Sequence, residues 1–421
     1  MKSKKVYGLD FGTTNSAVAI SQEGEVRVLP LALNGDKMVR SLLFFPRTGR
    51  AHFTGEDAIT HYIESGMEGR LIQSVKTFLP DKSFTGTALR GRNHTLEDLI
   101  ALILKHLKTK ADEITGEDIR SVVLGRPARF SVDPGIDDLA EKRLLRAAQL
   151  AGFEEIRFQF EPIAAAYSYE SRLSEAQLVL VADLGGGTSD FAIVRLGPQK
   201  KAVHDRSADI LGTQGVYVGG DKFNSEIMSH RLLKYFGSDL RYKSFDRMLQ
   251  MPPDLMRVIC EWHKIPSLKG REDRDFVARL CKLADDKEAA ARLYALIEED
   301  LGFMLFQAIE KAKQDLSINE FSTVSFCESV IEITEAIARP AFEQMISKEM
   351  QLVERCVDQL VRDAGVTIAD VDSVFLTGGT SYVPRVRRFF VNLFGEKKIK
   401  PGDAFISVAE GLALSSHIFS W

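Results

Sequence analysis

The sequence predicts an α/β protein built from two related lobes. Strand-like apolar runs alternate with helical patterns along the chain, as in the α/β class. One hairpin design also occurs twice, as GLDFGTTNSAVAI (8–20) and ADLGGGTSDFAIV (182–194). Each copy has an apolar run that ends in an aspartate, a Gly/Thr turn and a second apolar run, which indicates two β-hairpins. No Gly/Ser linker separates the copies, so we expect the lobes to pack together with a ligand site between them.

The elements of the first half follow in order from their patterns. Apolar residues at helical spacing predict a helix over 96–114, and SVVLGRPARF (121–130) predicts a strand that ends at Pro127. Residues 137–153 read as a helix that stops at Gly152. Residues 156–170 read as a short strand followed by a helix with a proline in its first turn.

The second half is predicted to be mostly helical. Residues 225–318 read as nearly all helical, with breaks at Pro252-Pro253 and Pro266. A third glycine turn, in VFLTGGTSYVP (374–384), follows a strand and leads into a helix through Pro384.

Composition limits the classes of function. The length of 421 residues suggests two to three domains at ~150 residues each, and 55 basic against 59 acidic residues give a net charge of −4. We therefore expect neither a nucleic-acid surface nor, since no run reaches ~18 apolar residues, a membrane span. The four cysteines are too far apart for a zinc module or a disulfide scaffold, and the N-terminus has no secretory apolar region. A reduced, cytoplasmic protein is the expectation.

The first glycine turn fits a phosphate-binding loop. Gly12 lets the backbone approach an anion, Thr13 and Thr14 add hydroxyl donors, and Asp10 at the strand end would face a hydrated Mg²⁺. For this motif alone, the alternative is a hairpin whose aspartate caps its own turn.

The second turn makes the phosphate interpretation stronger. Gly185, Gly186 and Gly187 lie between Asp183 and Thr188 and are followed by Asp190. Each of three glycines destabilises a hairpin by roughly 0.5–1 kcal/mol relative to alanine, and a purely structural hairpin needs only one or two. Two such loops predict a phosphate clamp with shared Mg²⁺. The chain contains neither the Walker GK[ST] loop nor the GxGxxG dinucleotide fingerprint at these turns.

Together these motifs resemble the actin-like ATPase superfamily, and specifically the DnaK-type 70-kDa heat-shock proteins. The two hairpins resemble the family's two phosphate motifs, and VFLTGGTSYVPRV resembles its adenosine motif. FEPIAAAYSYE, VKTFLP and GRPARF are similar to its connecting segment, its catalytic-lysine segment and its lobe-coupling strand. The resemblance runs from residue 6 to about residue 415. It implies a two-lobed actin-like ATPase fold, a duplicated ribonuclease H-like motif, with an enlarged helical subdomain in lobe II.

The resemblance also implies domain limits. Lobe I would comprise residues 1–181, completed by a C-terminal helix over 403–421, and lobe II residues 182–402 with a helical insertion over about 225–318. The interval from Gly220 to Glu310 is 90 positions, roughly double that of the family. An enlarged lobe tip is the preferred reading of this surplus, and a docking surface for a partner is the alternative.

The resemblance implies a role for each residue of the phosphate site. Asp10 and Asp183 would hold the waters around Mg²⁺, with Glu161 beside them connecting the lobes. Lys76, which the pattern alone would leave as a solvated surface lysine, would reach the γ-phosphate and orient the attacking water. Thr188 and Asp190 would assist that water or a K⁺ ion. The phosphates of ATP or ADP would be bound by Gly12, Thr13, Thr14, Asn15, Gly185, Gly186, Gly187, Gly219 and Gly220.

The base and ribose would bind elsewhere. Glu310, Lys313 and Ser317 share one face of a helix, and Gly378, Gly379, Thr380 and Tyr382 form the third turn. The sequence departs from the family where two arginines stack on adenine, because Gln314 and Tyr382 stand there. Tyrosine can stack on a purine, but glutamine supplies no guanidinium plane. A preference for adenine is therefore still expected, with weak affinity.

The chain ends soon after VAEGLALSSHIF (408–419), before any counterpart of the family's linker, peptide-binding domain and lid, as in its YegD-like branch. The expected function is a slow ATPase acting as a nucleotide switch, with a protein partner or client still to be identified and an undetermined oligomeric state. Three alternatives remain open: an ATP-sensing scaffold without turnover, a small-molecule kinase of the same superfamily, and an actin-like filament protein.

Overall fold

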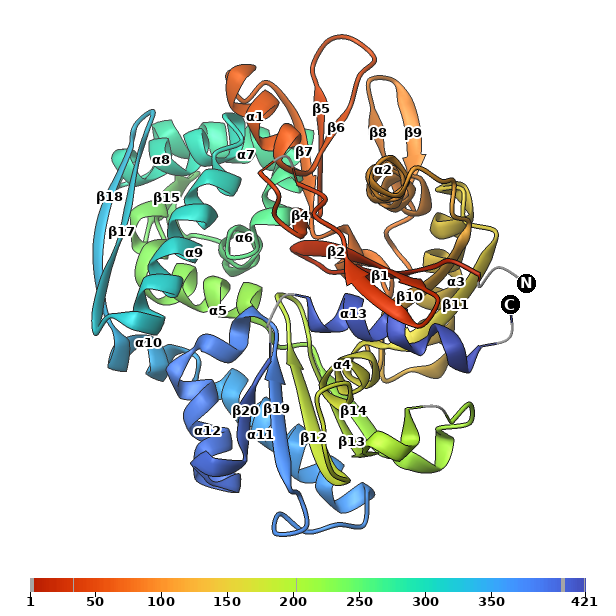
Figure 1. The fold of residues 1–421 in the computed structure, drawn as a ribbon. Helices are drawn as coiled ribbons and strands as arrows, with labels where there is room; N and C mark the ends of the chain where they lie inside the picture. Colours follow the sequence, from red (N-terminus) through yellow and green to blue (C-terminus); the bar gives the residue numbers. More distant parts are fainter. Residues whose placement is uncertain (1–3, 33, 202, 403–405, 420) are drawn as a thin grey trace. The chain divides into compact units, whose positions relative to one another are not determined.

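The computed structural model describes residues 4–32, 34–201, 203–402, 406–419 and 421. The chain divides into two compact units, Met1–Gly220 with Leu352–Trp421, and Asp221–Gln351. The first unit contains two large sheets, and the second is mostly helical (Figure 1). The site predicted for the phosphates falls in the first unit.

The first sheet has the strand order β11-β10-β1-β2-β3, with β4 paired to β2. Strands β1 and β2 form the first predicted hairpin, with Asp10 opposite Ala17, and β10 and β11 run parallel to β1. The strands are β1 (Val6–Phe11), β2 (Asn15–Gln22), β3 (Glu25–Val28), β4 (Met38–Arg40), β10 (Ser121–Arg126) and β11 (Glu155–Phe160).

The second sheet repeats this topology strand by strand. Its order is β14-β13-β12-β19-β20, in which β12 pairs antiparallel with β13 and parallel with β19. The strands are β12 (Gln177–Leu184), β13 (Ser189–Leu196), β14 (Ile210–Val216), β19 (Ser373–Thr377) and β20 (Ile399–Pro401). The duplication predicted from two hairpins is confirmed, and it extends to five strands in each sheet.

The helices of the first unit begin and end where the sequence provides caps. Thr95 and Asp98 form a capping box at the start of α2 (Leu96–Thr115), and Gly116 ends that helix in the left-handed conformation. Helix α3 (Pro134–Leu150) begins before the predicted residue 137 because Asp133 caps it and Pro134 takes its first position. Helices α4 (Glu161–Glu170) and α12 (Pro384–Phe394) also begin with a proline in the first turn, as predicted.

Smaller elements complete the first unit. They are α1 (Gly55–Glu64), the sheet of β5 (Leu42–Pro46), β6 (Phe53–Thr54) and β7 (Gly69–Gln73), the hairpin of β8 (Gly86–Leu89) and β9 (Arg92–Thr95), and α11 (Ser347–Asp363), which begins in the second unit. Helix α13 (Ser407–Leu414) packs on α4 and on β1 and β2 of the first sheet. Residues 403–405 and 420 of the predicted C-terminal helix lie outside the described residues.

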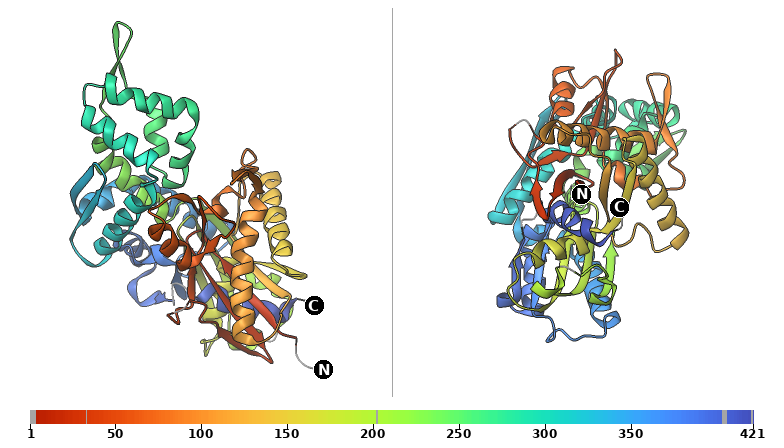
Figure 2. Two further views of the ribbon diagram at one scale, coloured as in Figure 1. Left: turned by 90° about the horizontal axis from the view of Figure 1, so that it is seen from above. Right: turned by 45° about the vertical axis from the view of Figure 1, so that its right-hand side comes forward.

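The second unit contains a hairpin that the sequence pattern did not reveal. Its strands β15 (Arg241–Ser244) and β16 (Arg247–Gln250) project from the helices in the left view of Figure 2. The prediction of near-continuous helix over 225–318 was wrong here, because four-residue strands joined by a turn without glycine give little periodic signal. The helices are α5 (Gly220–Ile227), α6 (Pro253–Ile259), α7 (Arg271–Leu283), α8 (Lys287–Glu298), α9 (Gly302–Ile318) and α10 (Arg339–Met345). A hairpin of β17 (Phe321–Glu328) and β18 (Ile331–Ala338) packs on α9.

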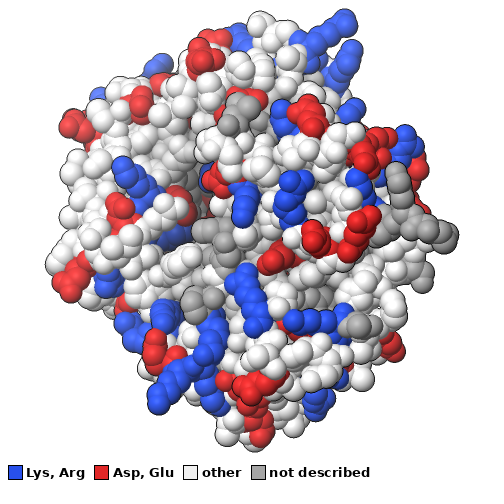
Figure 3. Space-filling model, viewed as in Figure 1, with Lys and Arg blue, Asp and Glu red and all other residues white. Residues whose placement is uncertain are grey.

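Charged side chains of both signs are interspersed over the face of the molecule in Figure 3. Among the described residues, no helix is long and apolar enough to cross a membrane.

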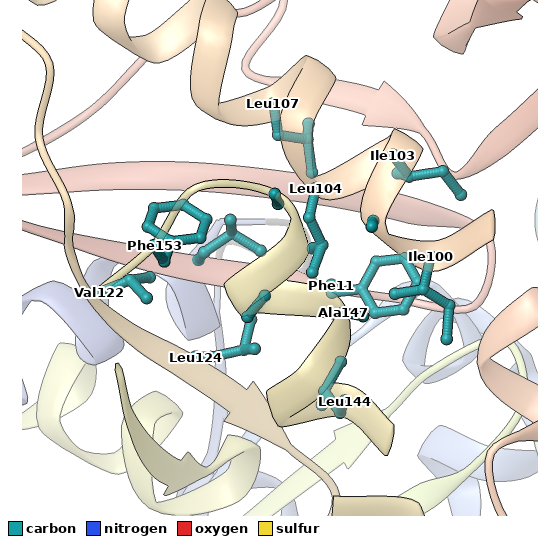
Figure 4. Close-up of a cluster of buried hydrophobic side chains, with 14 of the residues drawn as sticks. Phe11, Ile100, Ile103, Leu104, Leu107, Val122, Leu124, Leu144, Ala147 and Phe153 are labelled. Carbon is teal, nitrogen blue, oxygen red and sulfur yellow. The ribbon is translucent and has the colours of Figure 1, made fainter. Parts of the chain in front are cut away.

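The core that supports the first sheet lies between that sheet and helices α2 and α3. Figure 4 shows side chains from β1 and β10 packing against those of the two helices. Phe11, Leu104 and Leu144 are fully buried there, one from β1 and one from each helix. Asp10 therefore sits on a strand whose next residue is anchored in a close-packed core, which fixes the position of its carboxylate.

Candidate functional site

The two predicted phosphate turns lie against each other in the first unit. One follows β1 at Gly12–Thr14, and the other joins β12 to β13 at Gly185–Thr188. A Cβ placed on Gly187 would come within 2.8 Å of the Thr13 side-chain oxygen Oγ1. The two turns therefore lie in direct contact, and a side chain at this position would displace the Thr13 hydroxyl.

The third glycine turn and the start of α5 are hydrogen-bonded to the second phosphate turn. The Gly185 carbonyl accepts hydrogen bonds from the Thr380 hydroxyl at 2.8 Å and from the Gly220 amide at 3.1 Å. Gly378 has a φ of 81°, and a side chain there would overlap the Leu184 carbonyl. A side chain on Gly219 would in the same way overlap the Gly186 carbonyl. The glycine segments predicted to bind the phosphates and the third glycine turn therefore lie in contact with one another in the first unit.

One buried aspartate, Asp190, and two half-buried ones, Asp10 and Asp183, lie beside these turns. Asp183 and Asp190 are direct neighbours across the β12–β13 hairpin, and Asp190 accepts a hydrogen bond from the Ala128 amide at 2.7 Å. Burial, reinforced by the charge of Glu161, raises the pKa of both Asp10 and Asp190 to about 7. Burial and the same neighbouring carboxylates raise the pKa of Asp183 well above its ordinary value. The ionised aspartates are therefore not neutralised by neighbouring positive charge, and a bound cation would stabilise their ionised form.

Lys76 is the cation of the cluster. Its ammonium donates to Glu161 at 2.6 Å, and both side chains are buried. Burial by itself would lower the pKa of Lys76, but the charges of Glu161 and Asp10 raise it above its usual value. Lys76 lies in the short 3₁₀ turn Val75–Phe78, and it is not the solvated surface lysine that the pattern alone suggests.

The segment before Lys76 contains features that the sequence did not reveal. Ser74 adopts a left-handed φ of 57°, which is uncommon for a residue with a side chain. The side-chain oxygens of Ser74 and Gln73 are buried without a hydrogen-bond partner among the described residues. Backbone strain and unpaired buried oxygens concentrate at functional sites. Neither has a sequence signature, because serine and glutamine are ordinary residues in loops and strands.

The donor set fits a phosphate chain with a hydrated Mg²⁺. The Thr14 hydroxyl is buried without a partner in the described part of the chain, and the glycine turns leave the backbone accessible to an anion. No group of three or more acidic, histidine or cysteine side chains within the described ranges could by itself hold a metal ion. Magnesium commonly takes only one or two protein carboxylates and completes its shell with water and phosphate oxygens. Asp10 and Asp183 supply that number.

The residues predicted for the ribose and base are in two places. Glu310, Lys313 and Ser317 lie on α9 in the second unit, whereas Gly378–Tyr382 belong to the first. Glu310 accepts hydrogen bonds from Lys313 at 2.7 Å, from Asn224 at 2.6 Å and from Gln314 at 3.0 Å. Burial would raise the pKa of Glu310, but these donors, Lys313 first, lower it. Asn224 was not predicted, since an asparagine in a helix has no spacing that links it to a residue 86 positions later.

Comparison with known proteins agrees with this geometry. The family model described as "Hsp70 protein" matches residues 6–250 and 297–421. The chain is 28% identical over 427 residues to the chaperone protein DnaK of Thermotoga neapolitana and 27% identical over 441 residues to that of Thermosipho africanus. Each alignment covers all of this chain and 60% of the relative, so the chain spans about three fifths of the relatives' length. The unmatched residues 251–296 hold α6, α7 and most of α8. Because the family model covers most of its length, the chain belongs to the Hsp70 family, whose two-lobed actin-like fold agrees with the duplicated sheets.

Proposed function

We propose that this protein binds ATP with Mg²⁺ and hydrolyses it slowly, as a nucleotide-driven conformational switch. The observation that carries the proposal is the meeting of the two glycine turns beside a buried lysine and four buried or half-buried acids. Positioned cations and backbone amides are what phosphoryl transfer requires, because the reaction depends mainly on positioning and on neutralising charge.

Each residue has a proposed role at the phosphates. Thr13 and Thr14 would contact the β- and γ-phosphates from one side, and Gly186 and Gly187 from the other. Lys76 would contact the γ-phosphate and orient the attacking water. When bound, Mg²⁺ supplies charge neutralisation to the phosphate oxygens, and Asp10 and Asp183 would hold its waters.

The remaining assignments complete the proposal. Thr188 and Asp190 would assist the attacking water or bind K⁺, and Glu161 would hold Lys76 in place and join the lobes. Glu310, Lys313 and Ser317 would bind the ribose and base from one side, with Gly378–Tyr382 on the other. Lobe boundaries at 1–181 and 182–402, the C-terminal helix in lobe I, and a cytoplasmic location are further parts of the proposal. So is a chaperone-like role with an unidentified protein client.

A single-turnover assay tests the proposed reaction. The purified chain is mixed with radiolabelled ATP, Mg²⁺ and K⁺ at protein excess, and release of phosphate is followed over hours. Lys76→Ala should retain ATP binding by isothermal titration and lose hydrolysis. Lys82→Ala, which changes an exposed lysine of the same segment, is the matched control and should keep both. Equal rates in the Lys76 and Lys82 variants would remove Lys76 from the mechanism.

An ATP-sensing scaffold without turnover is the second candidate. The observation that favours it is the adenine side, where Gln314 donates to Glu310 and Tyr382 is 56% exposed, in place of two stacking arginines. This function predicts that ATP and ADP change the pattern of limited proteolysis while no phosphate is released. Phosphate release that depends on Lys76 would exclude it.

A further inference from the structure

The β15–β16 hairpin of the second unit exposes apolar side chains that its own fold does not use. Phe245 at its tip is 95% exposed, Met248 50% and Leu249 42%. Residues 245 and 246 form a two-residue turn in which Phe245 has a φ of 53°. This left-handed position favours glycine, so a phenylalanine there is strained and gains no burial in return. Residues in strained conformations are often found at binding sites, although positive φ also occurs at other turns of this chain.

One edge of the hairpin is covered by the second unit itself. The Arg241 carbonyl accepts from the Asp285 amide at 2.9 Å, and the Arg241 amide donates to the Asp285 carboxylate at 3.0 Å. Tyr242 packs edge-on against Phe276 of α7, with ring centroids 5.3 Å apart. The β15 edge is therefore occupied, and the hairpin is held firmly on α7.

The β16 edge is open. Within the described ranges, β16 pairs with no strand other than β15. The Met251 amide donates to the Leu240 carbonyl, and the register pairs Tyr242 with Leu249 and Lys243 with Met248. Hydrogen-bonded pairs alternate along an antiparallel ladder, so the backbone groups of Met248 and Gln250 point away from β15. The backbone groups of their partners on β15, Arg241 and Lys243, point away from β16. This agrees with the hydrogen bonds between Arg241 and Asp285.

The charge of the hairpin indicates what could pair with this edge. Arg241, Lys243 and Arg247 form no ion pair with any described residue, and Asp246 is the single acid between them. Sheet edges in stable proteins are commonly protected by short strands, charged side chains, proline or a bulge. The four-residue β16 edge carries Arg247, but it also presents the half-exposed apolar side chains of Met248 and Leu249.

We propose that the β16 edge binds an extended segment of a partner protein by strand addition. The segment would carry alternating apolar and acidic side chains, with Phe245 as an apolar anchor at one end. Main-chain hydrogen bonds to Met248 and Gln250 would supply affinity, and Arg241 and Lys243, which share one face of the hairpin, would select for acidic residues on that face. This site is separate from the proposed ATPase residues, and its test does not depend on them.

A synthetic peptide tests the proposal. The probe is a fluorescein-labelled heptapeptide of alternating glutamate and valine, and its anisotropy is measured with the full chain. We expect saturable binding that weakens at least tenfold when lysine replaces each glutamate, or when proline replaces the central valine. No binding of the acidic probe, or equal binding of the lysine version, would overturn the proposal.

Two variants separate the edge from the fold. Met248→Pro removes an outward-facing amide, and the Met248 side chain with it, without removing a hydrogen bond to β15, so it should abolish probe binding while circular dichroism and thermal unfolding stay unchanged. Phe245→Gly should weaken binding at least fivefold and relieve the strained turn. Phe321→Ser, which changes another largely exposed phenylalanine of the second unit, is the matched control and should bind as wild type does.

Other occupants of the edge would give different results. Concentration-dependent dimerisation in sedimentation velocity that Met248→Pro abolishes, with no probe binding, would identify a second copy of this chain and overturn the proposal. Binding to phosphatidylserine vesicles that Lys243→Glu abolishes, with no probe binding, would identify a membrane and also overturn it. Wild-type probe affinity in Met248→Pro would show that strand addition is wrong.

Discussion

At the scale of single residues, the pair of Lys76 and Glu161 holds opposite charges together inside the first unit. Removing one partner of a buried pair costs about 3–5 kcal/mol, because the other charge is left uncompensated. We expect Lys76→Ala to lower the free energy of unfolding of the nucleotide-free protein by about that much. Glu161→Gln in the same chain should restore part of the loss, giving a coupling of at least about 1 kcal/mol. Urea unfolding of the two single variants and the double variant measures it, and strictly additive changes would contradict the prediction.

Asp190 should make the stability of the nucleotide-free protein depend on pH. Its pKa is raised to about 7 by burial and by Glu161, above the value of about 3.9 for an unfolded aspartate. The folded state therefore holds the proton more tightly, and the free energy of unfolding falls as pH rises from about 4 to about 7.

Asp190→Asn tests this dependence with an amide oxygen that can still accept from Ala128. Between pH 5 and pH 8, with EDTA present, wild type should lose about 2–3 kcal/mol more than the variant does. Urea unfolding midpoints at the two pH values measure the difference. Because the charge of Asp190 also raises the pKa of Asp183, the difference between the proteins reports Asp190 together with its coupling to Asp183. Equal losses in the two proteins would show that Asp190 stays ionised throughout this range.

The residue types at the phosphate turns could be predicted from sequence, whereas their partners could not. Glycine next to threonine after an apolar run has a physical reason that can be read locally, and the structure brings Gly187 and Thr13 together. The bond from Ala128 to Asp190 joins positions 62 residues apart through a backbone amide, which any residue except proline could supply. Lys76 likewise could be predicted as a site residue only from the family resemblance, because its sequence pattern alone suggests a surface lysine.

At the scale of elements, α13 packs closely on α4 because Gly411 has no side chain. A Cβ at this position would overlap the Ala164 carbonyl of α4, well inside van der Waals contact. The α13 backbone cannot move easily, since Ala409 and Ala413 pack on Ala17 and Ala19 of β2. We expect Gly411→Ala to destabilise the first unit by about 3 kcal/mol or more, at the upper end of overpacking effects.

Gly270→Ala is the matched control for that substitution. Gly270 has a φ of −56°, and an added Cβ would meet only the Ser267 carbonyl at an ordinary 3.5 Å. Differential scanning calorimetry of the two variants measures the contrast. A Gly411→Ala protein that unfolds within a degree of wild type would mean that α13 shifts to accommodate a methyl group.

Element prediction succeeded where caps and periodicity agreed. The predicted helix over 96–114 differs by one residue at its end from Leu96–Thr115, where Thr95, Asp98 and Gly116 supply both caps. The β15–β16 hairpin escaped prediction because its turn contains Phe245 instead of glycine or asparagine. The same residue, Phe245, is largely exposed and belongs to the proposed binding surface.

At the scale of the whole molecule, the duplicated sheets give the site its electrostatic character. The first sheet contributes Asp10, the second contributes Asp183 and Asp190, and Lys76 is the cation paired with Glu161 among them. The acids outnumber the lysine, and their raised pKa values reflect this excess of negative charge. A polyphosphate brings further negative charge, so we expect its binding to require a divalent cation.

Removal of Mg²⁺ should therefore abolish the stabilisation of the folded protein by nucleotide. At 100 times the dissociation constant, a ligand that binds only the folded state stabilises it by about 2.7 kcal/mol, or a few degrees in Tm for a chain of this size. We expect this increase with Mg²⁺ and ADP, and its loss when EDTA is added, while EDTA alone has a smaller effect. Differential scanning fluorimetry measures the four conditions, with Mg²⁺ and GDP as a control for the base. An equal increase with and without Mg²⁺ would mean that the protein's own cations suffice to hold the phosphates, and the proposed metal role of Asp10 and Asp183 would then be wrong.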